Sequence, residues 1–198
     1  MGMEQKPETP SYETQLLMVR EELDTLPPVN LADGYEARSF QPGDEPAWEH
    51  VMKESFRQEI SFDQHMKQDD PYQPERVWFV CHNGTPVATA SAWFRPAFGE
   101  QTGYVHMVGA LSGHAGKSLG YGVSLASLHR MKQEGRSRAV LNTDDFRIPA
   151  IVTYLKLGFI PLFAADDHRE RWTKLALALG KGPIRCLAAD GTTTYVGE

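Results

Sequence analysis

Cysteine is scarce in this sequence, because Cys81 and Cys186 are the only two thiols in 198 residues. Two thiols cannot build the disulfide framework of a small secreted protein or a four-ligand zinc site, so we expect no metal. No apolar stretch approaches the roughly 18 residues of a membrane-spanning helix, and residues 1–7 lack the apolar core of a secretion signal. From these absences we expect a cytoplasmic protein without a membrane partner.

Positive charge is also in the minority. The chain has 20 lysines and arginines against 26 aspartates and glutamates, which gives a formal net charge of −6 at pH 7. A protein that coats nucleic acid carries a basic excess, so we expect no nucleic-acid partner. A negative net charge does not exclude one local anion-binding site. The length suits a single domain with one hydrophobic core.

The order of the predicted elements indicates one mixed α/β domain. Asn83-Gly84 lies between two β-rich runs and predicts a hairpin with a type I′ turn, because both central residues of that turn need positive φ. A first helix with Pro46 in its first turn ends near Phe56. The predicted strands cover 35–40, 77–81, 86–94, 104–111, 138–142 and 159–163, and the later helices cover 117–134, 148–157 and 166–179.

The sequence leaves the secondary structure of two segments undecided. Residues 15–20 are too few to separate strand from helix by pattern. The stretch after Gly180 fits either a hairpin around Asp190-Gly191 or a loose tail. We therefore divide the chain into an N-terminal extension (1–34), a central domain (35–163) and a C-terminal helix with tail or hairpin (164–198) that belongs to the same globule.

A glycine-rich loop leads into the helix that is predicted from residue 117. It is not a Walker A loop, because that motif needs a glycine five residues before Gly116 and position 111 is leucine. The spacing of Gly116, Gly120 and Gly122 does not satisfy the dinucleotide-binding motif either. The open backbone amides at a helix start could hold a pyrophosphate. Alternatively, the glycines merely allow a tight turn and close packing of the helix on the sheet.

Two motifs carry a resemblance to a known family. The segment 108–120 resembles the acetyl-CoA motif of the GNAT superfamily of N-acetyltransferases, and the segment 149–159 (Pro-Ala-Ile-Val-Thr-Tyr-Leu-Lys-Leu-Gly-Phe) resembles the second signature of that family. The resemblance covers about 35–163. It implies a single mixed α/β domain with a central, mostly antiparallel twisted sheet, a parallel splayed strand pair and flanking helices.

The resemblance also implies a cofactor site and shows three departures from the family pattern. It implies that acetyl-CoA is the co-substrate. Ala115 stands where the family usually has arginine or glutamine, Ser118 where it usually has glycine, and Arg147 where asparagine is frequent. The residues that would contact acetyl-CoA are Val108, Gly109 and Ala110 for the pantetheine arm, and Ala115, Gly116, Lys117, Ser118, Leu119 and Gly120 for the pyrophosphate.

Acetyl transfer to an amine needs a group that accepts a proton and a group that donates one. His106 is the candidate base, because an imidazole with an ordinary pKa near 6.5 can accept a proton at neutral pH. Strand alternation would place His106 on the same face as Val108. Tyr154 is the candidate donor to the leaving thiolate, as the family resemblance implies. Each residue has an ordinary structural alternative: a solvated or core histidine, and a tyrosine ring packed at a helix edge.

The pair Asp144-Asp145 follows a predicted strand, and we expect it to cap the helix that begins near Arg147. The alternative for a carboxylate pair at a strand end is to face a cationic substrate. The resemblance implies an N-acetyltransferase that moves acetyl from acetyl-CoA to a primary amine by direct attack in a ternary complex. The acceptor would be a small molecule or a peptide. The alternative is a non-catalytic acyl-CoA-binding or regulatory module with the same fold. A homodimer is left open.

Overall fold

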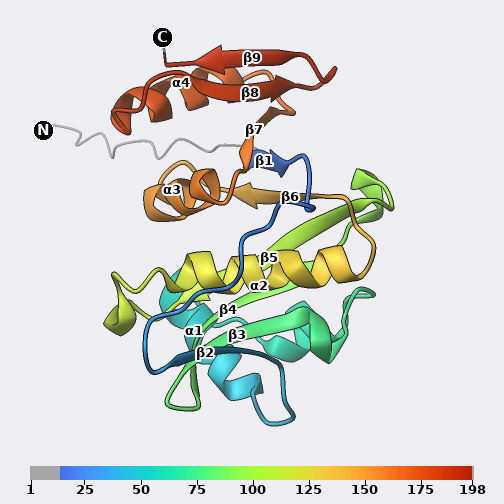
Figure 1. The fold of residues 1–198 in the computed structure, drawn as a ribbon, viewed down its shortest axis with the longest axis vertical. Helices are drawn as coiled ribbons and strands as arrows, with labels where there is room; N and C mark the ends of the chain where they lie inside the picture. Colours follow the sequence, from blue (N-terminus) through green and yellow to red (C-terminus); the bar gives the residue numbers. More distant parts are fainter. Residues whose placement is uncertain (1–13, 198) are drawn as a thin grey trace, which may run out of the picture.

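A computed structural model describes residues 14–197, so the sequence-based expectations for residues 1–13 lie outside it. One mixed sheet runs through this part of the chain in the order β2-β3-β4-β5-β6-β1-β7-β8-β9 (Figure 1). The strands are β1 Leu16–Arg20, β2 Tyr35–Ser39, β3 Val77–His82, β4 Thr85–Trp93, β5 Thr102–Ala110, β6 Arg138–Thr143, β7 Ile160–Phe163, β8 Ile184–Ala188 and β9 Thr193–Val196. The α-helices are α1 Glu45–Phe56, α2 Leu119–Gln133, α3 Ile148–Lys156 and α4 His168–Ala178.

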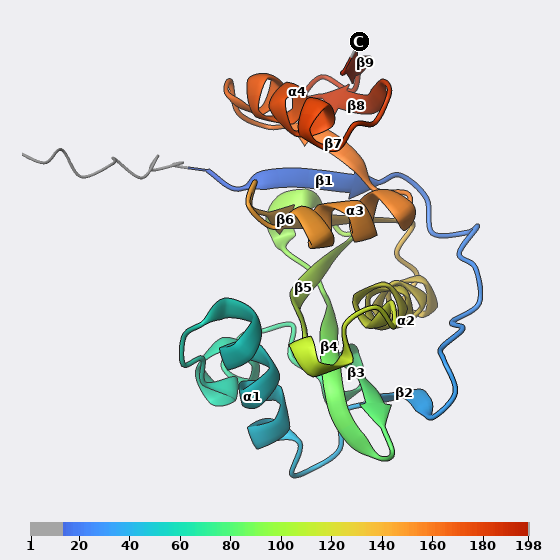
Figure 2. The same ribbon diagram turned by 90° about the vertical axis from the view of Figure 1, so that its left-hand side faces the viewer.

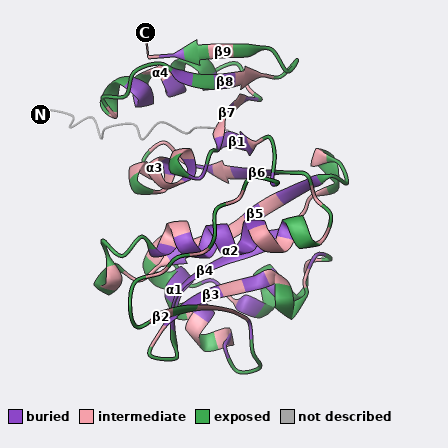
Figure 3. Ribbon diagram, in the orientation of Figure 1, coloured by how far each residue is buried: buried purple, intermediate pink, exposed green. Residues whose placement is uncertain are grey.

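The helices cover both faces of the sheet. Figure 2 shows α1 on one face of β4 and β5 and α2 on the other. The α1 face is held by an aromatic cluster that includes Trp48, Phe62 and Trp93. On the other face, Leu125, Leu128 and other buried side chains pack against the strands. Figure 3 shows α2 and the central strands coloured largely as buried or intermediate. No helix within 14–197 is both long and apolar enough to cross a bilayer.

The sheet is mostly antiparallel, as predicted, with two parallel pairs. Strands β5 and β6 pair in parallel only from Thr102↔Arg138 to Tyr104↔Val140, and beyond Tyr104 no further pairing joins them. The second parallel pair, β7–β8, was not predicted. Beyond Tyr104 the two strands separate toward their carboxyl ends, and this leaves one edge of β5 unpaired.

The undecided N-terminal segment is strand β1, and it lies inside the sheet. It pairs antiparallel with β6 on one side and with β7 on the other. Leu16 and Met18 are fully buried, because both flanks and both faces of the strand are covered. A strand from the predicted extension therefore joins the two halves of the sheet.

The turn predicted at Asn83-Gly84 is confirmed, and the undecided C-terminal stretch also forms a hairpin. Asn83 and Gly84 have φ values of 49° and 81°, as a type I′ turn requires. Strands β8 and β9 form an antiparallel hairpin around Asp190-Gly191, so the C-terminal stretch is a hairpin and not a tail. Cys81 and Cys186 are both buried and free.

Candidate active site

A cavity of about 670 Å³ occupies the opening between β5 and β6. One wall consists of β5 and the loop after it, up to the start of α2. The opposite wall consists of the end of β6 and the inner face of α3. Gln15, Ser55 and Phe56 complete the lining from the N-terminal segment and from the end of α1. Within the described residues, no group of three or more metal-ligating side chains is close enough together to hold an ion.

A bulge interrupts β5 where it passes the cavity. Met107 has a φ of 51°, and the register with β4 shifts between Thr89↔Gly109 and Ser91↔His106. Three steps on β5 therefore face two on β4, which leaves one extra residue on β5. As a result, His106 lies beside Trp93 on the α1 face, while Val108 packs with the cluster on the α2 face. The prediction that alternation puts both on one face is wrong, because a bulge reverses the alternation.

The loop after β5 presents open backbone to the cavity. A Cβ atom added at Gly116 or Gly120 would meet no atom within 4 Å. Ser118 is the N-cap of α2 and has φ 55° and ψ 30°, the left-handed conformation that glycine adopts without cost. Ala115, Gly116, Ser118, Leu119 and Gly120 all line the cavity, whereas Lys117 is exposed and outside the lining. This backbone arrangement is compatible with a bound pyrophosphate.

The end of α1 is tied to the end of β5. The Ala110 amide donates to Ser55 Oγ at 3.1 Å, and the Ser112 amide donates to Glu54 Oε1 at 2.6 Å. The hydrogen bonds from Ser112 lower the pKa of Glu54. A Cβ atom at Gly109 would lie 2.6 Å from both Met52 Cε and Ser55 Oγ. Gly109 is therefore needed for the close approach of α1 to β5.

Tyr154 projects from α3 into the cavity. Its side chain is 6% exposed, and its ring packs edge-on against Phe159 at 6.1 Å between centroids. Burial raises the pKa of Tyr154, so the phenol keeps its proton at any working pH. Among residues 14–197 its hydroxyl has no hydrogen-bond partner, which leaves it available to a ligand.

His106 is half-buried between two aromatic rings. Its ring centroid lies 5.5 Å from that of Trp93 and 5.7 Å from that of Tyr104. Burial, followed by the nearby charge of Arg95, lowers the pKa of His106 to about 4. The imidazole is therefore neutral at pH 7, as a base must be. It is also a much weaker base than a histidine with the ordinary pKa near 6.5, which the sequence predicts.

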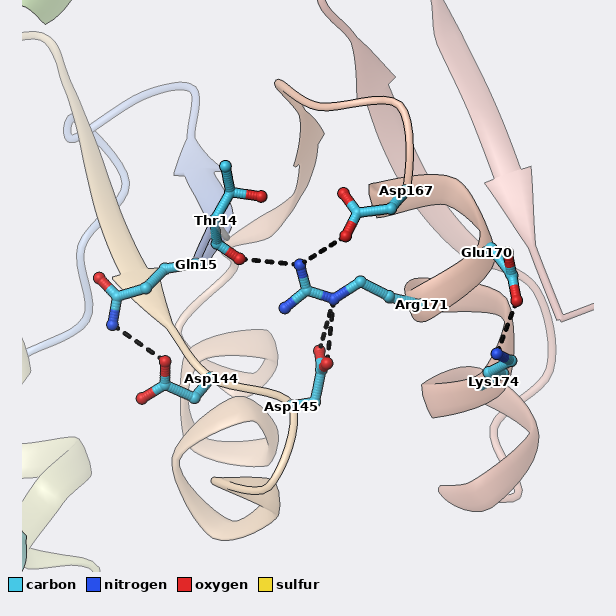
Figure 4. A network of polar contacts seen from close by, with 8 residues as sticks. All are labelled: Thr14, Gln15, Asp144, Asp145, Asp167, Glu170, Arg171 and Lys174. Carbon is cyan, nitrogen blue, oxygen red and sulfur yellow. Dashed lines mark hydrogen bonds and ion pairs between the residues drawn. The ribbon is translucent and has the colours of Figure 1, made fainter. Parts of the chain in front are cut away.

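The two aspartates before α3 do not cap it. No side chain caps this helix, whose N-cap residue is Arg147. Asp144 instead accepts from Arg147 Nε at 3.0 Å and from Gln15 Nε2 at 3.0 Å. Asp145 accepts from Arg171 Nε at 2.9 Å, and Arg171 also donates to the carbonyl of Thr14 (Figure 4). The expected caps are wrong because nearby arginines bind both carboxylates.

Several cavity residues could not be identified from the sequence. Ser55, Phe56 and Gln15 belong to segments far from both motifs, and nothing in their local pattern indicates a site. Thr143 and Arg147 lie next to the second motif. Their position after a predicted strand and before its helix was the one available signal, since ligands bind at the carboxyl ends of parallel strands.

Comparison with known proteins identifies the same family that the two sequence motifs resemble. A family model described as "Acetyltransferase (GNAT) family" matches residues 39–159, which is more than half of this 198-residue chain. A mycothiol acetyltransferase of Thermomonospora curvata is 29% identical over 154 residues, which cover 73% of this chain and 51% of that protein. One of Streptomyces scabiei is 28% identical over 146 residues, which cover 70% and 47%. The chain spans about half the length of the curated relatives it matches.

Solved structures with a similar fold come from the same group of proteins. A GCN5-related N-acetyltransferase from Sphaerobacter thermophilus aligns with a TM-score of 0.57 and 22% identity, over 74% of this chain and 47% of that one. The ribosomal-protein-S18-alanine N-acetyltransferase from Escherichia coli aligns with a TM-score of 0.52 and 17% identity, over 63% and 76%. At these identities the likeness concerns the fold alone, and it confirms the predicted mixed α/β class.

Proposed function

The chain belongs to the acetyltransferase (GNAT) family of acyltransferases, and we propose that it moves an acetyl group from acetyl-CoA to a primary amine. One observation carries the proposal. A single cavity is lined both by the open glycine loop before α2 and by the protonated Tyr154 hydroxyl. An anionic ligand held by the loop would therefore extend toward a proton donor. We place this activity in residues 35–163, with 164–198 as part of the same globule and with Gln15 of the N-terminal extension in the cavity lining.

The positions of most of these residues on the cavity wall support the binding roles that we propose for them. Val108, Gly109 and Ala110 belong to the part of β5 that β6 leaves unpaired. An extended pantetheine arm would pair with this backbone as an added strand. The amides from Ala115 to Gly120 would hold the pyrophosphate, with Lys117 nearby in solvent. Because Ser55 Oγ already binds the Ala110 amide, this side chain would move or share the amide when the arm binds.

The chemistry needs two proton movements. The acceptor nitrogen bonds to the acetyl carbon, the carbon–sulfur bond breaks, and the products are an acetamide and CoA thiol. His106 would accept the proton that the nitrogen loses, directly or through water. Tyr154 would donate a proton to the sulfur and recover one from solvent. Since the pKa of His106 is about 4, relay through water to solvent suits it better than lasting protonation.

Thermal unfolding and thiol release together test the proposal. We expect acetyl-CoA, but not Mg-ATP, to raise the melting temperature by a few degrees at saturating concentration. Free thiol should then appear with one member of a panel of small-molecule and peptide amines. Because the curated relatives are named mycothiol acetyltransferases, the panel should include mycothiol precursors without the acetyl group. Stabilisation by acetyl-CoA without thiol release would favour the non-catalytic acyl-CoA-binding module.

A further inference from the structure

Among the described residues that line the cavity, one side chain carries a permanent positive charge. That residue is Arg147, and Asp144 is the only carboxylate beside it in the lining. The remaining basic groups of the lining are His106 and His114. Lys117, the cation of the glycine loop, is exposed and not part of the lining. An anion in the cavity would therefore meet its strongest partner at Arg147.

Arg147 stands at the end of the cavity where the glycine loop begins. Because β5 and β6 run parallel, their carboxyl ends reach the same edge of the sheet. There β5 continues into the loop, and β6 continues through Asp144 to Arg147. Tyr154 follows seven residues later on α3, which places it about 10 Å further along the helix axis. The loop and Arg147 therefore lie at the same edge of the sheet, and both line the cavity together with Tyr154.

The guanidinium of Arg147 is held in place but not saturated. Its Nε donates to Asp144 at 3.0 Å, and its Cζ lies 4.3 Å from the centroid of the Phe56 ring. The two terminal nitrogens make no hydrogen bond within residues 14–197. Thr143 supplies a second unused group: it is 3% exposed, it lines the cavity, and its hydroxyl has no partner in the described chain. A ligand oxygen at this end would satisfy both residues.

We infer that Arg147 is the diphosphate-binding cation of the site, with the Thr143 hydroxyl beside it. The inference rests on the proposed use of acetyl-CoA, whose diphosphate would otherwise lie against a loop with no cation in the cavity. It also accounts for the departure at position 115, where an alanine replaces the arginine or glutamine that the family resemblance leads us to expect. The positive charge comes instead from the start of α3.

Two acetyl donors and one substitution test the inference. Dissociation constants are measured for acetyl-CoA and for S-acetylpantetheine, which lacks the diphosphate, with the wild type and Arg147→Gln. Glutamine can still donate to Asp144, so the substitution removes the charge with little disturbance of the helix start. We expect acetyl-CoA to bind at least tenfold more weakly and S-acetylpantetheine to bind within twofold of the wild type. Adding Ala115→Arg to this variant should restore most of the affinity for acetyl-CoA.

A matched control is Arg169→Gln. Arg169 also lies over an aromatic ring, at 5.1 Å from the centroid of Phe163, and also makes a side-chain hydrogen bond, but outside the cavity. It should change neither constant. If Arg147→Gln does not fold, Arg147→Lys replaces it, with a smaller loss that is again confined to acetyl-CoA.

Three results would overturn the inference. Equal weakening of both donors would mean that Arg147 acts through the structure of the pantetheine channel. Unchanged binding of acetyl-CoA with a raised KM for carboxylate-bearing amines would assign Arg147 to the acceptor. Failure of the wild type to bind acetyl-CoA at all would remove the proposed function itself, and the inference with it.

Discussion

At the scale of single residues, the hydroxyl of Tyr154 can be removed without disturbing its surroundings. Tyr154→Phe keeps the ring that packs against Phe159 and removes the one polar atom that faces the cavity. We expect kcat to fall by about 10²-fold or more, because a positioned proton donor contributes on that order. Binding of acetyl-CoA, measured by calorimetry, should stay unchanged. Normal turnover by this variant would show that sulfur receives its proton from elsewhere.

His106 should leave a distinctive pH signature. Because burial lowers its pKa to about 4, the imidazole stays neutral across the assay range, and the acceptor amine, with a pKa near 10.4, controls the acid side of the profile. We expect kcat/KM for the amine to rise tenfold per pH unit from pH 5 to 9 without a break near 6.5. His106→Ala should lower the whole line by about 10²-fold and leave its slope unchanged.

The comparison of wild type and His106→Ala profiles contains its own control. An inflection near pH 6.5 in the wild type that disappears in the variant would mean that the histidine titrates normally and is well hydrated. Superimposable profiles would exclude His106 from the proton transfer.

Ser118 adopts a backbone conformation that costs free energy. Its left-handed φ of 55° disfavours an L-residue by about 1–2 kcal/mol, while glycine adds about 0.4–1 kcal/mol of entropy to the unfolded chain. The first effect is larger, so Ser118→Gly should stabilise the protein by about 0.5–1 kcal/mol in urea unfolding. Ser118→Ala, which keeps the strain, is the control and should give no gain. A less stable glycine variant would mean that the serine hydroxyl contributes a compensating bond.

At the scale of elements, the junction of α3 and α4 depends on one buried guanidinium. Arg171 is 6% exposed and binds Asp145 before α3, Asp167 at the start of α4 and the Thr14 carbonyl before β1 (Figure 4). Arg171→Met would leave two carboxylates without this partner, and we expect a loss of about 3 kcal/mol in the free energy of unfolding. The control is Lys174→Met on the same helix, whose ion pair is more than 70% exposed, with a change of about 0.5 kcal/mol or less.

The elements also show how far the sequence could be interpreted. Periodicity and turn chemistry predicted α2, α3 and the Asn83-Gly84 hairpin, because these depend on local contacts. The place of β1 could not be predicted, since a five-residue strand acquires its pairing from β6 and β7, more than a hundred residues away. The bulge at Met107 could not be predicted either, because no glycine marks its positive φ.

The candidate site likewise contains some residues that local motifs identify and others that only tertiary packing brings there. The loop and Tyr154 carry local motifs and were found in the sequence, and both line the cavity. Ser55, Phe56 and Gln15 reach it only through tertiary packing. The low pKa of His106 likewise results from burial among Trp93 and Tyr104, which no local pattern reveals.

At the scale of the whole molecule, the position of β1 has a consequence for cooperativity. The strand lies between the part of the sheet that forms the cavity and the C-terminal part that ends in β9. Met18 is fully buried in the cluster that contains Leu141 of β6, Phe163 of β7 and Trp172 of α4. Loss of its side chain would weaken contacts with both parts at once.

We therefore expect Met18→Ala to lower the free energy of unfolding by about 2–5 kcal/mol while unfolding remains a single transition. Tryptophan fluorescence and far-ultraviolet circular dichroism in urea should report the same midpoint, because Trp48 and Trp93 lie in one part and Trp172 in the other. The control is Leu177→Ala, since Leu177 is 67% exposed and contributes little burial. Two separate transitions in the Met18 variant would mean that the parts fold independently and that β1 merely lies between them.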